Sequence, residues 1–271
     1  MKKISTTLVT APLLAAALVG ASPVRAQGMT DAWQFEVSIY GWFPAISGTT
    51  SFPPSGNGPS VDVSMGDVID ALKFAFMGSF EARNGQWGLW TDLVYGDFGA
   101  SKSRTRDITI GGNELPVGVS ADASLDVKSW VWTLAGLYNL KSDTDGQTDL
   151  IFGARLLDMT NTLKWTFSAD VSPYPSRSGS GEVSLSNWDA VLGIKGRVNF
   201  GEGRKWFVPY YADVGAGESK LTWQLQAGLG YQFDWGAVLA TWRYLDYDFK
   251  DSSRIQTMSM NGPTIGVAFK F

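Results

Sequence analysis

The stretch IGVAFKF at residues 265–271 decides the fold prediction. Its apolar residues Ile265, Val267, Phe269 and Phe271 occupy every second position, so they share one face of an extended strand. The sequence stops on this strand, and chain ends in water usually fray. A closed membrane barrel needs an ordered last strand, because that strand must pair with the first. The ending therefore predicts a barrel strand.

The other end of the sequence has the pattern of a secretion signal. Two lysines precede a mostly apolar stretch at 8–19, and Val24-Arg25-Ala26 has the small-x-small form of a cleavage site. A membrane-spanning helix needs about 20 apolar residues, and this stretch is shorter. We expect cleavage between Ala26 and Gln27, which leaves residues 27–271 as one domain.

Composition excludes several classes of function. The formal net charge is −4, and the expected signal peptide carries bases but no acids, so the mature chain is more negative. A negative chain without a basic run is a poor candidate for binding nucleic acid. Cysteine is absent, which excludes disulfides and thiolate metal sites. The 31 glycines and 12 tryptophans favour many strands over helices.

Extended segments fill the mature chain, and each is close to or above the roughly 9–11 residues that cross a bilayer as a tilted strand. The predicted fold is an all-β, transmembrane, antiparallel up-and-down barrel of ten strands, with eight or twelve as alternatives. The predicted strands are 32–46, 72–83, 86–99, 122–141, 148–167, 182–200, 205–215, 220–234, 236–250 and 257–271.

The connections between these segments alternate in length. Tight turns are predicted at 84–86, 142–147, 201–204 and 233–235. The other connections are read as longer, namely 47–71, 100–121, 168–181, 216–219 and 251–256. Outer-membrane barrels alternate in this way, with short periplasmic turns and long outward loops.

The cost of placing charge in lipid assigns the two faces. Trp188, Leu192 and Val198 alternate with Asp189, Lys195 and Arg197 along one segment, while the leucines of 221–233 alternate with glutamines. A lysine or arginine facing lipid costs roughly 2–4 kcal/mol near the middle of the bilayer. The apolar set is therefore predicted to face outward.

Two strands break this alternation. In 122–141 the apolar positions change from Leu125 and Val127 to Trp130 and Trp132, and 148–167 shows a similar change. A β-bulge shifts the alternation by one residue, and so does a strand that leaves the membrane. Both explanations stay open at this point.

Aromatic residues gather near the predicted strand ends, as in the two interfacial girdles of a membrane barrel. The alternative is the core of a soluble β-sandwich. The residues assigned to the girdles are Trp33, Trp42, Trp87, Tyr95, Tyr138, Trp206, Trp223, Trp235 and Tyr244.

A resemblance to known proteins rests on the segments Val61-Asp62-Val63-Ser64, 67–72, 74–78, Glu81-Ala82-Arg83, 85–89 and the ending 262–271. These segments resemble an uncharacterised family of proteobacterial outer-membrane β-barrel proteins. The resemblance implies an outer-membrane location, and no activity is assigned to the family. It also implies that Ile265, Val267, Phe269 and Phe271 form the signal read by the barrel-assembly machinery. The middle of the chain, about 100–256, matches only in general barrel character.

The candidate site is the barrel lumen. Opposed charges there either form a selective constriction or pair with one another and fill the space. The principal lumen charge candidates are Glu81, Arg83, Asp92, Asp189, Lys195, Arg197 and Arg243. Lys73, Gln224, Gln226 and Lys270 are also predicted to face inward, together with Trp90, Met77, Phe207 and Tyr211. Ten strands lie nearer the filled end of the range, so a filled lumen is favoured.

An enzyme is disfavoured because the chain has no histidine, the usual general base and metal ligand. A Ser–Lys pair or two carboxylates sharing a proton would remain, but no motif marks either. We expect no cofactor and a structural or binding role in the cell envelope; the alternative is a narrow channel for small polar solutes or ions. Expected partners are outer-membrane lipid, lipopolysaccharide and the assembly machinery, and the oligomeric state is open.

The connection 47–71 contains a possible short helix at 67–72. Ser64 and Asp67 form a capping-box pattern in front of it. The helix is predicted to present a surface at the barrel mouth, to fold inward as a plug, or only to pack on neighbouring loops. A receptor or adhesin role for the loops is permitted without a specific signal.

Overall fold

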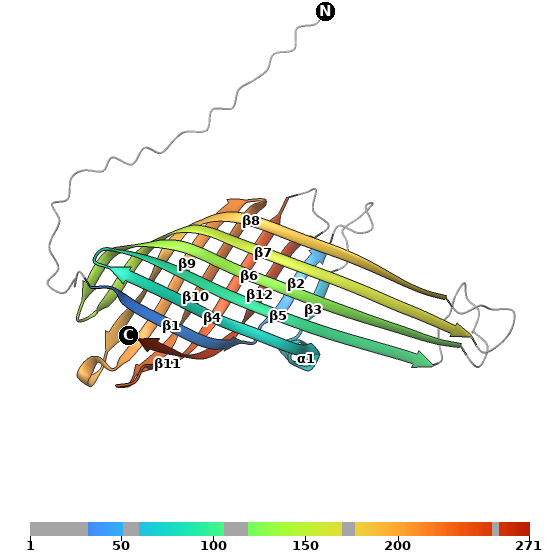
Figure 1. Cartoon of the computed structure of the whole chain (residues 1–271), viewed down its shortest axis with the longest axis horizontal. Helices are drawn as coiled ribbons and strands as arrows, with labels where there is room; N and C mark the ends of the chain where they lie inside the picture. Colours follow the sequence, from blue (N-terminus) through green and yellow to red (C-terminus); the bar gives the residue numbers. More distant parts are fainter. Residues whose placement is uncertain (1–31, 51–59, 106–118, 170–176, 251–254) are drawn as a thin grey trace, which may run out of the picture.

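The computed structural model describes residues 32–50, 60–105, 119–169, 177–250 and 255–271 (Figure 1). The expected signal peptide and its cleavage site lie outside these residues. No helix in the described part of the chain is long and apolar enough to cross a membrane. The elements are β1 (Gln34–Trp42), β2 (Ala45–Thr50), β3 (Ser60–Val63), α1 (Met65–Ala71), β4 (Leu72–Asn84), β5 (Trp87–Thr105), β6 (Val119–Asp143), β7 (Gly146–Ala169), β8 (Arg177–Phe200), the 3-10 turn η1 (Glu202–Arg204), β9 (Trp206–Gly217), β10 (Ser219–Gln232), β11 (Ala237–Phe249) and β12 (Ile255–Lys270).

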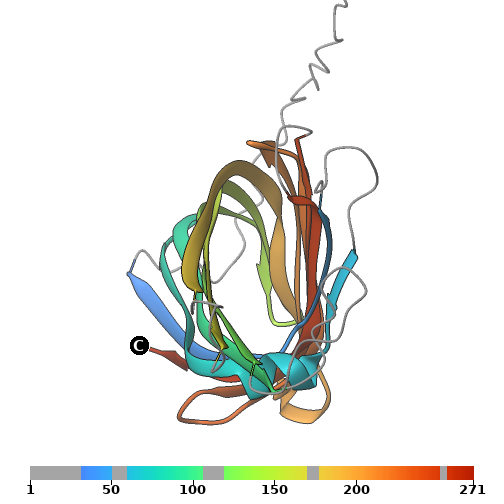
Figure 2. The ribbon, with the colours of Figure 1, turned by 90° about the vertical axis from the view of Figure 1, so that its right-hand side faces the viewer.

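Ten of these strands close into an antiparallel barrel, as predicted. The order is β1, then β4 to β12, and β12 pairs back onto β1 from Glu36↔Lys270 to Trp42↔Thr264 (Figure 2). Each neighbour in the ring is the next barrel strand in the chain, which is the up-and-down connectivity. Closure leaves no free sheet edge in the ring, which a lipid environment requires.

The predicted strand 32–46 is interrupted in the structure. β1 ends at Trp42, and β2 continues along the same edge of β12 after Phe43 and Pro44. Proline has no N–H for the ladder, so a break at this point is expected. β2 then pairs with the short strand β3, so the predicted loop 47–71 contains a small sheet extension as well as a helix.

The two ends of the barrel differ. At the turn end, β4–β5, β6–β7, β8–β9 and β10–β11 are joined by short turns, and Gly85 adopts φ +57 in the first of them. That left-handed conformation is accessible to glycine without a Cβ clash. Short turns mark the periplasmic side of outer-membrane barrels, so the opposite, loop end faces outward. The prediction of a longer outward connection at 216–219 is wrong, because only Glu218 separates β9 from β10.

Strands β5 to β8 have between 19 and 25 residues and extend well beyond the other strands at the loop end (Figure 1). The predicted loops 100–121 and 168–181 are therefore partly strand. Register between β5 and β6 runs without a shift, and β6 and β7 pair without a shift from Val119 to Asn139. The break in alternation is therefore no bulge.

The outer wall of the barrel is apolar, as the cost of burying charge in lipid predicts. Leu192, Val214 and Leu225 each expose about half of their surface to the surroundings, with 55%, 52% and 50%. The inward neighbours Val191, Asp213 and Gln224 are buried. Aromatic pairs occur toward both ends, for example Trp87 with Tyr138 at the turn end and Trp223 with Tyr244 toward the loop end. Trp42 is a correction to the predicted girdle: it is 3% exposed and lies in the lumen.

Candidate functional site

The inward side chains of the ten strands fill the lumen in three zones. The middle layer, as we call it, consists of Tyr40, Asp92, Thr133, Arg155, Tyr211, Asp213, Gln224 and Arg243. Successive inward residues of one strand pass through the zones in order, as Val94, Asp92 and Trp90 of β5 illustrate. An apolar cluster lies on the loop side of the middle layer, and a charged cluster lies on the turn side.

Arg243 organises one half of the middle layer. Its Nη1 lies 2.9 Å from Asp92 Oδ2 and donates to the Tyr40 hydroxyl at 3.0 Å, while Nη2 donates to Gln224 Oε1 at 2.9 Å. The Tyr40 hydroxyl in turn donates to Asp92 Oδ1 at 2.5 Å. The guanidinium also lies over the Trp42 ring, 4.7 Å from its centroid. The Arg243 guanidinium therefore has four side-chain partners in the lumen.

Arg155 organises the other half of the middle layer. Its side chain is completely buried and forms an ion pair with Asp213, whose other contact is the Tyr211 hydroxyl. Arg155 Nε donates to Thr133 Oγ1 at 3.2 Å, and Nη1 donates to Thr222 Oγ1 at 3.4 Å. Two guanidiniums are thus balanced by two carboxylates, which lowers the cost of burying all four charges.

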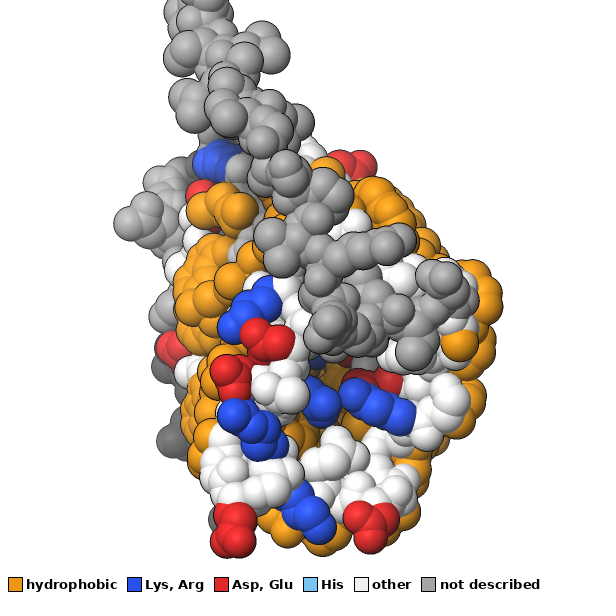
Figure 3. All heavy atoms as spheres, turned by 90° about the vertical axis from the view of Figure 1, so that its left-hand side faces the viewer, with side chains coloured by type: hydrophobic (Ala, Val, Ile, Leu, Met, Phe, Trp, Pro, Cys, Tyr) orange, Lys and Arg blue, Asp and Glu red, His pale blue; other side chains and the backbone are white. Residues whose placement is uncertain are grey.

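A second charged cluster lies toward the turn end. Arg83 makes a bidentate contact with Asp149, at 2.8 Å from Nη1 and 2.5 Å from Nη2, and also bonds Glu81. Lys195 forms an ion pair with Glu81 from the opposite wall. Figure 3 views this end and shows charged side chains gathered within the barrel outline, with hydrophobic ones along the outer wall.

The structure places all seven principal lumen charge candidates on the inner face, in different environments. Asp189 accepts from the backbone N–H of Ser219 at 2.8 Å and from Asn187, so it supports the β9–β10 turn. Arg197 lies over the Phe207 ring, 5.2 Å from its centroid. Of the other predicted inward residues, Lys73 lies outside the lumen, because its side chain is 53% exposed and pairs with Asp126.

The predicted inward residues Gln224, Trp90, Phe207 and Tyr211 are buried in the lumen, and Met77 packs against its apolar cluster. Gln226 lines the turn-side cavity and donates to Thr241 Oγ1 at 2.7 Å. Lys270 lies at the mouth of that cavity, half exposed, and pairs with Glu36 at 3.3 Å.

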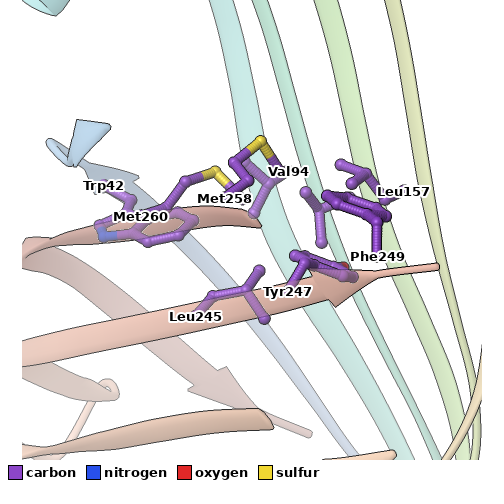
Figure 4. Packing of buried hydrophobic residues seen from close by; sticks show 9 residues of the cluster. Trp42, Val94, Leu157, Leu245, Tyr247, Phe249, Met258 and Met260 are labelled. Carbon is purple, nitrogen blue, oxygen red and sulfur yellow. The ribbon is translucent and has the colours of Figure 1, made fainter. Parts of the chain in front are cut away.

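The apolar cluster on the loop side was not predicted. It consists of Trp42, Val94, Val131, Leu157, Leu245, Tyr247, Phe249, Met258 and Met260 (Figure 4). The sequence signal for this cluster was the broken alternation in β6 and β7. Val131 and Leu157 are buried inward residues, and the next inward residue toward the turn end is Thr133 on β6 and Arg155 on β7. Toward the loop end, the inward positions of these strands are apolar, and the outward positions lie beyond the lipid. The apolar residues therefore move from the outer face to the inner face along each strand.

Two cavities flank the middle layer. The turn-side cavity has a volume of about 180 Å³ and is lined by charged residues such as Glu81, Arg83 and Lys195. The loop-side cavity has a volume of about 220 Å³ and is lined almost entirely by apolar residues. Tyr40 contributes to both linings, and the buried middle layer lies between them.

The helix α1 adjoins the loop-side cavity. The predicted capping box is present: Ser64 Oγ accepts from the Asp67 N–H at 3.2 Å, and Asp67 accepts from the Ser64 N–H at 3.2 Å. Val68 is buried, and it lines the cavity together with Ile69. The helix therefore forms part of the wall at the barrel mouth.

Among the described residues, no group of three or more acidic residues has the arrangement of a metal site. Each middle-layer carboxylate has its own arginine partner. The geometry accordingly supplies stable charge pairing rather than a shared proton.

Comparison with known proteins gives a likeness of fold. No family model matches the chain, and no curated protein sequence matches it. The crystal structure of the outer membrane protease OmpT from Escherichia coli is similar, with a TM-score of 0.51 and 9% identity over 91% of this chain and 99% of that chain. The translocator domain of the autotransporter NalP from Neisseria meningitidis has a TM-score of 0.42 and 13% identity, covering 90% of both chains.

The attachment invasion locus protein Ail of Yersinia pestis also matches, with a TM-score of 0.33 and 10% identity over 89% of this chain and 100% of that one. At these identities the likeness concerns the fold alone. The closed ten-stranded barrel with its apolar outer wall is an outer-membrane β-barrel, and the chain belongs in the bacterial outer membrane.

Proposed function

We propose that this protein has a non-enzymatic structural or binding role in the outer membrane, with a lumen that does not conduct. The observation that carries the proposal is the middle layer. Arg155 and Arg243 are 0% and 1% exposed, and Asp92 is 3% exposed. A water-filled pore would leave such charges in contact with solvent.

The size of the barrel supports the same function. Barrels of about eight strands are filled by side chains, whereas 16–18 strands leave an aqueous channel. Here aromatic residues add to the filling, since the Trp90 ring packs on the Tyr211 ring of the middle layer with centroids 5.3 Å apart. The two cavities thus lie on opposite sides of the middle layer, which separates them.

The absence of histidine continues to argue against an enzyme. Of the two alternatives left by the sequence, two carboxylates sharing a proton have no support in the middle layer, because Asp92 and Asp213 each face a guanidinium.

Single-channel recording tests this proposal. The purified protein in planar bilayers is expected to show little or no steady conductance, and the lumen variant Arg197→Ala is expected to stay equally silent. The variant Arg243→Ala removes part of the middle layer and is expected to add brief, small openings. Reproducible open steps of porin size in the unmodified protein, with ion selectivity altered by Arg197→Ala, would identify a channel and overturn the proposal.

A further inference from the structure

The loop-side cavity has the lining of a binding site for an apolar molecule. Of the described residues that line it, none is aspartate, glutamate, lysine or arginine. Four are methionines, namely Met77, Met159, Met258 and Met260. Methionine side chains are flexible and polarisable, so they adapt to apolar ligands of varied shape. A charged ligand would have to leave water without any counter-charge, which is strongly unfavourable.

The barrel wall beside this cavity has a seam between β1 and β4. Their ladder ends at Ile39↔Gly78, although β1 continues to Trp42 and β4 begins at Leu72. On its other edge β1 stays paired with β12 as far as Trp42. The Trp42 N–H bonds the Met77 sulfur at 3.0 Å, so a side chain replaces the missing ladder partner.

The cavity reaches through this seam. Tyr40 and Trp42 point into the lumen. Gly41 and Phe43 alternate with them and therefore lie on the outer side of the chain. Ile39 lies on that same side and is 54% exposed on the outer wall. Residues from both sides of β1 line the same cavity. A space confined to the lumen would touch only the inward set. The cavity therefore continues between the two strands toward the outer face.

The seam lies at the level of the loop-side aromatic residues. On β4, Phe76 is opposite Tyr95 of β5, and the Tyr95 ring packs on Trp130 with centroids 4.3 Å apart. Such aromatic residues mark the boundary between hydrocarbon and headgroups. The helix α1 contacts β2 and β5, on opposite sides of the seam, and so bounds it toward the loop end.

We propose that the loop-side cavity binds an uncharged, apolar small molecule with one or two fused aromatic rings, or an aliphatic molecule of equal bulk, which enters from the membrane between β1 and β4. The volume of about 220 Å³ sets the size, because an apolar cavity of about 150 Å³ in another protein stays dry and takes up benzene. This inference deepens the binding role proposed above, but the two can fail separately.

Methionine methyl groups provide the test. The full mature chain, labelled with 13C at its methionine methyls, is folded into phospholipid nanodiscs and titrated with naphthalene. The signals of the four lining methionines are expected to shift with saturation. Met65 of α1 lies outside the lining, is 40% exposed and is expected not to shift.

A pair of matched variants separates binding in the cavity from solution of naphthalene in lipid. Ala75 lines the seam, whereas Ala227 faces lipid on β10. Ala75→Phe is expected to bind naphthalene about tenfold more weakly or worse, because the added ring occupies the cavity. Ala227→Phe adds the same ring elsewhere and should bind as the unmodified chain does. If Ala75→Phe does not insert, Val127→Phe in the same lining takes its place.

The proposal is overturned if the methionine signals do not move, if Met65 shifts in parallel with the others without saturation, or if the two phenylalanine variants bind equally. A barrel that passes the conductance test and fails this one would keep a structural role without a ligand. A barrel that binds naphthalene and also conducts would keep the site and lose the sealed lumen.

Discussion

The loop half and the turn half of the lumen are built by the same ten strands but hold opposite chemistry. Toward the turn end Glu81, Arg83 and Lys195 form ion pairs with one another beside a polar cavity. Toward the loop end Val131 and Leu157 belong to a buried apolar cluster. The backbone alternation is the same in both halves. The difference teaches that the inner face of a membrane barrel is set residue by residue, while lipid constrains only the outer face.

The largest effect is expected in the layer that divides the halves. Arg243→Ala leaves Asp92 buried without its cation, and breaking a buried pair in this way costs about 3–5 kcal/mol of folding free energy. The measurement is urea unfolding in phospholipid vesicles, followed by the shift in gel mobility between boiled and unboiled samples.

Arg204→Ala is the matched control for this arginine deletion. Arg204 pairs with Asp145 at the turn end, where both side chains are about half exposed. Exposed pairs contribute roughly 0–1 kcal/mol. Equal losses in the two variants would mean that the middle layer is hydrated, and the division of the lumen into two closed halves would no longer hold.

A smaller loss is expected in the apolar half. Leu157 is completely buried in the lumen cluster, and truncation to alanine leaves a cavity that costs about 2–5 kcal/mol. Leu225→Ala on the outer wall is the comparison, because lipid tails can fill the space of the lost atoms. The same vesicle titration should rank Leu157→Ala well below Leu225→Ala in stability. The reverse order would mean that the loop half is loosely packed.

Much of the fold could be predicted because lipid imposes a strict rule on one face. The alternation of Leu192 and Leu225 with Lys195 and Gln224 was enough to assign the faces of β8 and β10. The turns predicted ten strands but left eight and twelve open, and the closed ring of the structure has ten. The interior obeys no such rule. Trp42 was assigned to an interfacial girdle because a tryptophan near a strand end suits either position, and its contact with Arg243 depends on strand pairing across the barrel.

The candidate site could be predicted only in part for the same reason. Inward charges follow from alternation, but their partners come from distant strands: Lys195 of β8 meets Glu81 of β4, and Arg243 of β11 meets Asp92 of β5. The apolar half left a signal in the changed alternation of 122–141 and 148–167. Two explanations fitted that signal, and only the unshifted strand register separated them.

The smallest effect is expected outside both halves, where β5 and β6 extend past the loop-side aromatic residues. There the Lys73 ammonium donates to Asp126, and this hydrogen bond with the lysine charge holds the pKa of the Asp126 carboxyl below its usual range. A depressed carboxyl pKa stabilises the folded state above the unfolded pKa of about 3.9, and the gain is lost as the pH falls through the folded value.

The urea midpoint of Asp126→Asn should therefore lie slightly below that of the unmodified chain at pH 7 and should coincide with it near pH 2. Both side chains are substantially exposed, so the difference at pH 7 is expected to be far smaller than that for Arg243→Ala. A difference that persists at low pH would show that Asp126 acts through packing, and the pair with Lys73 would then not account for its contribution to stability.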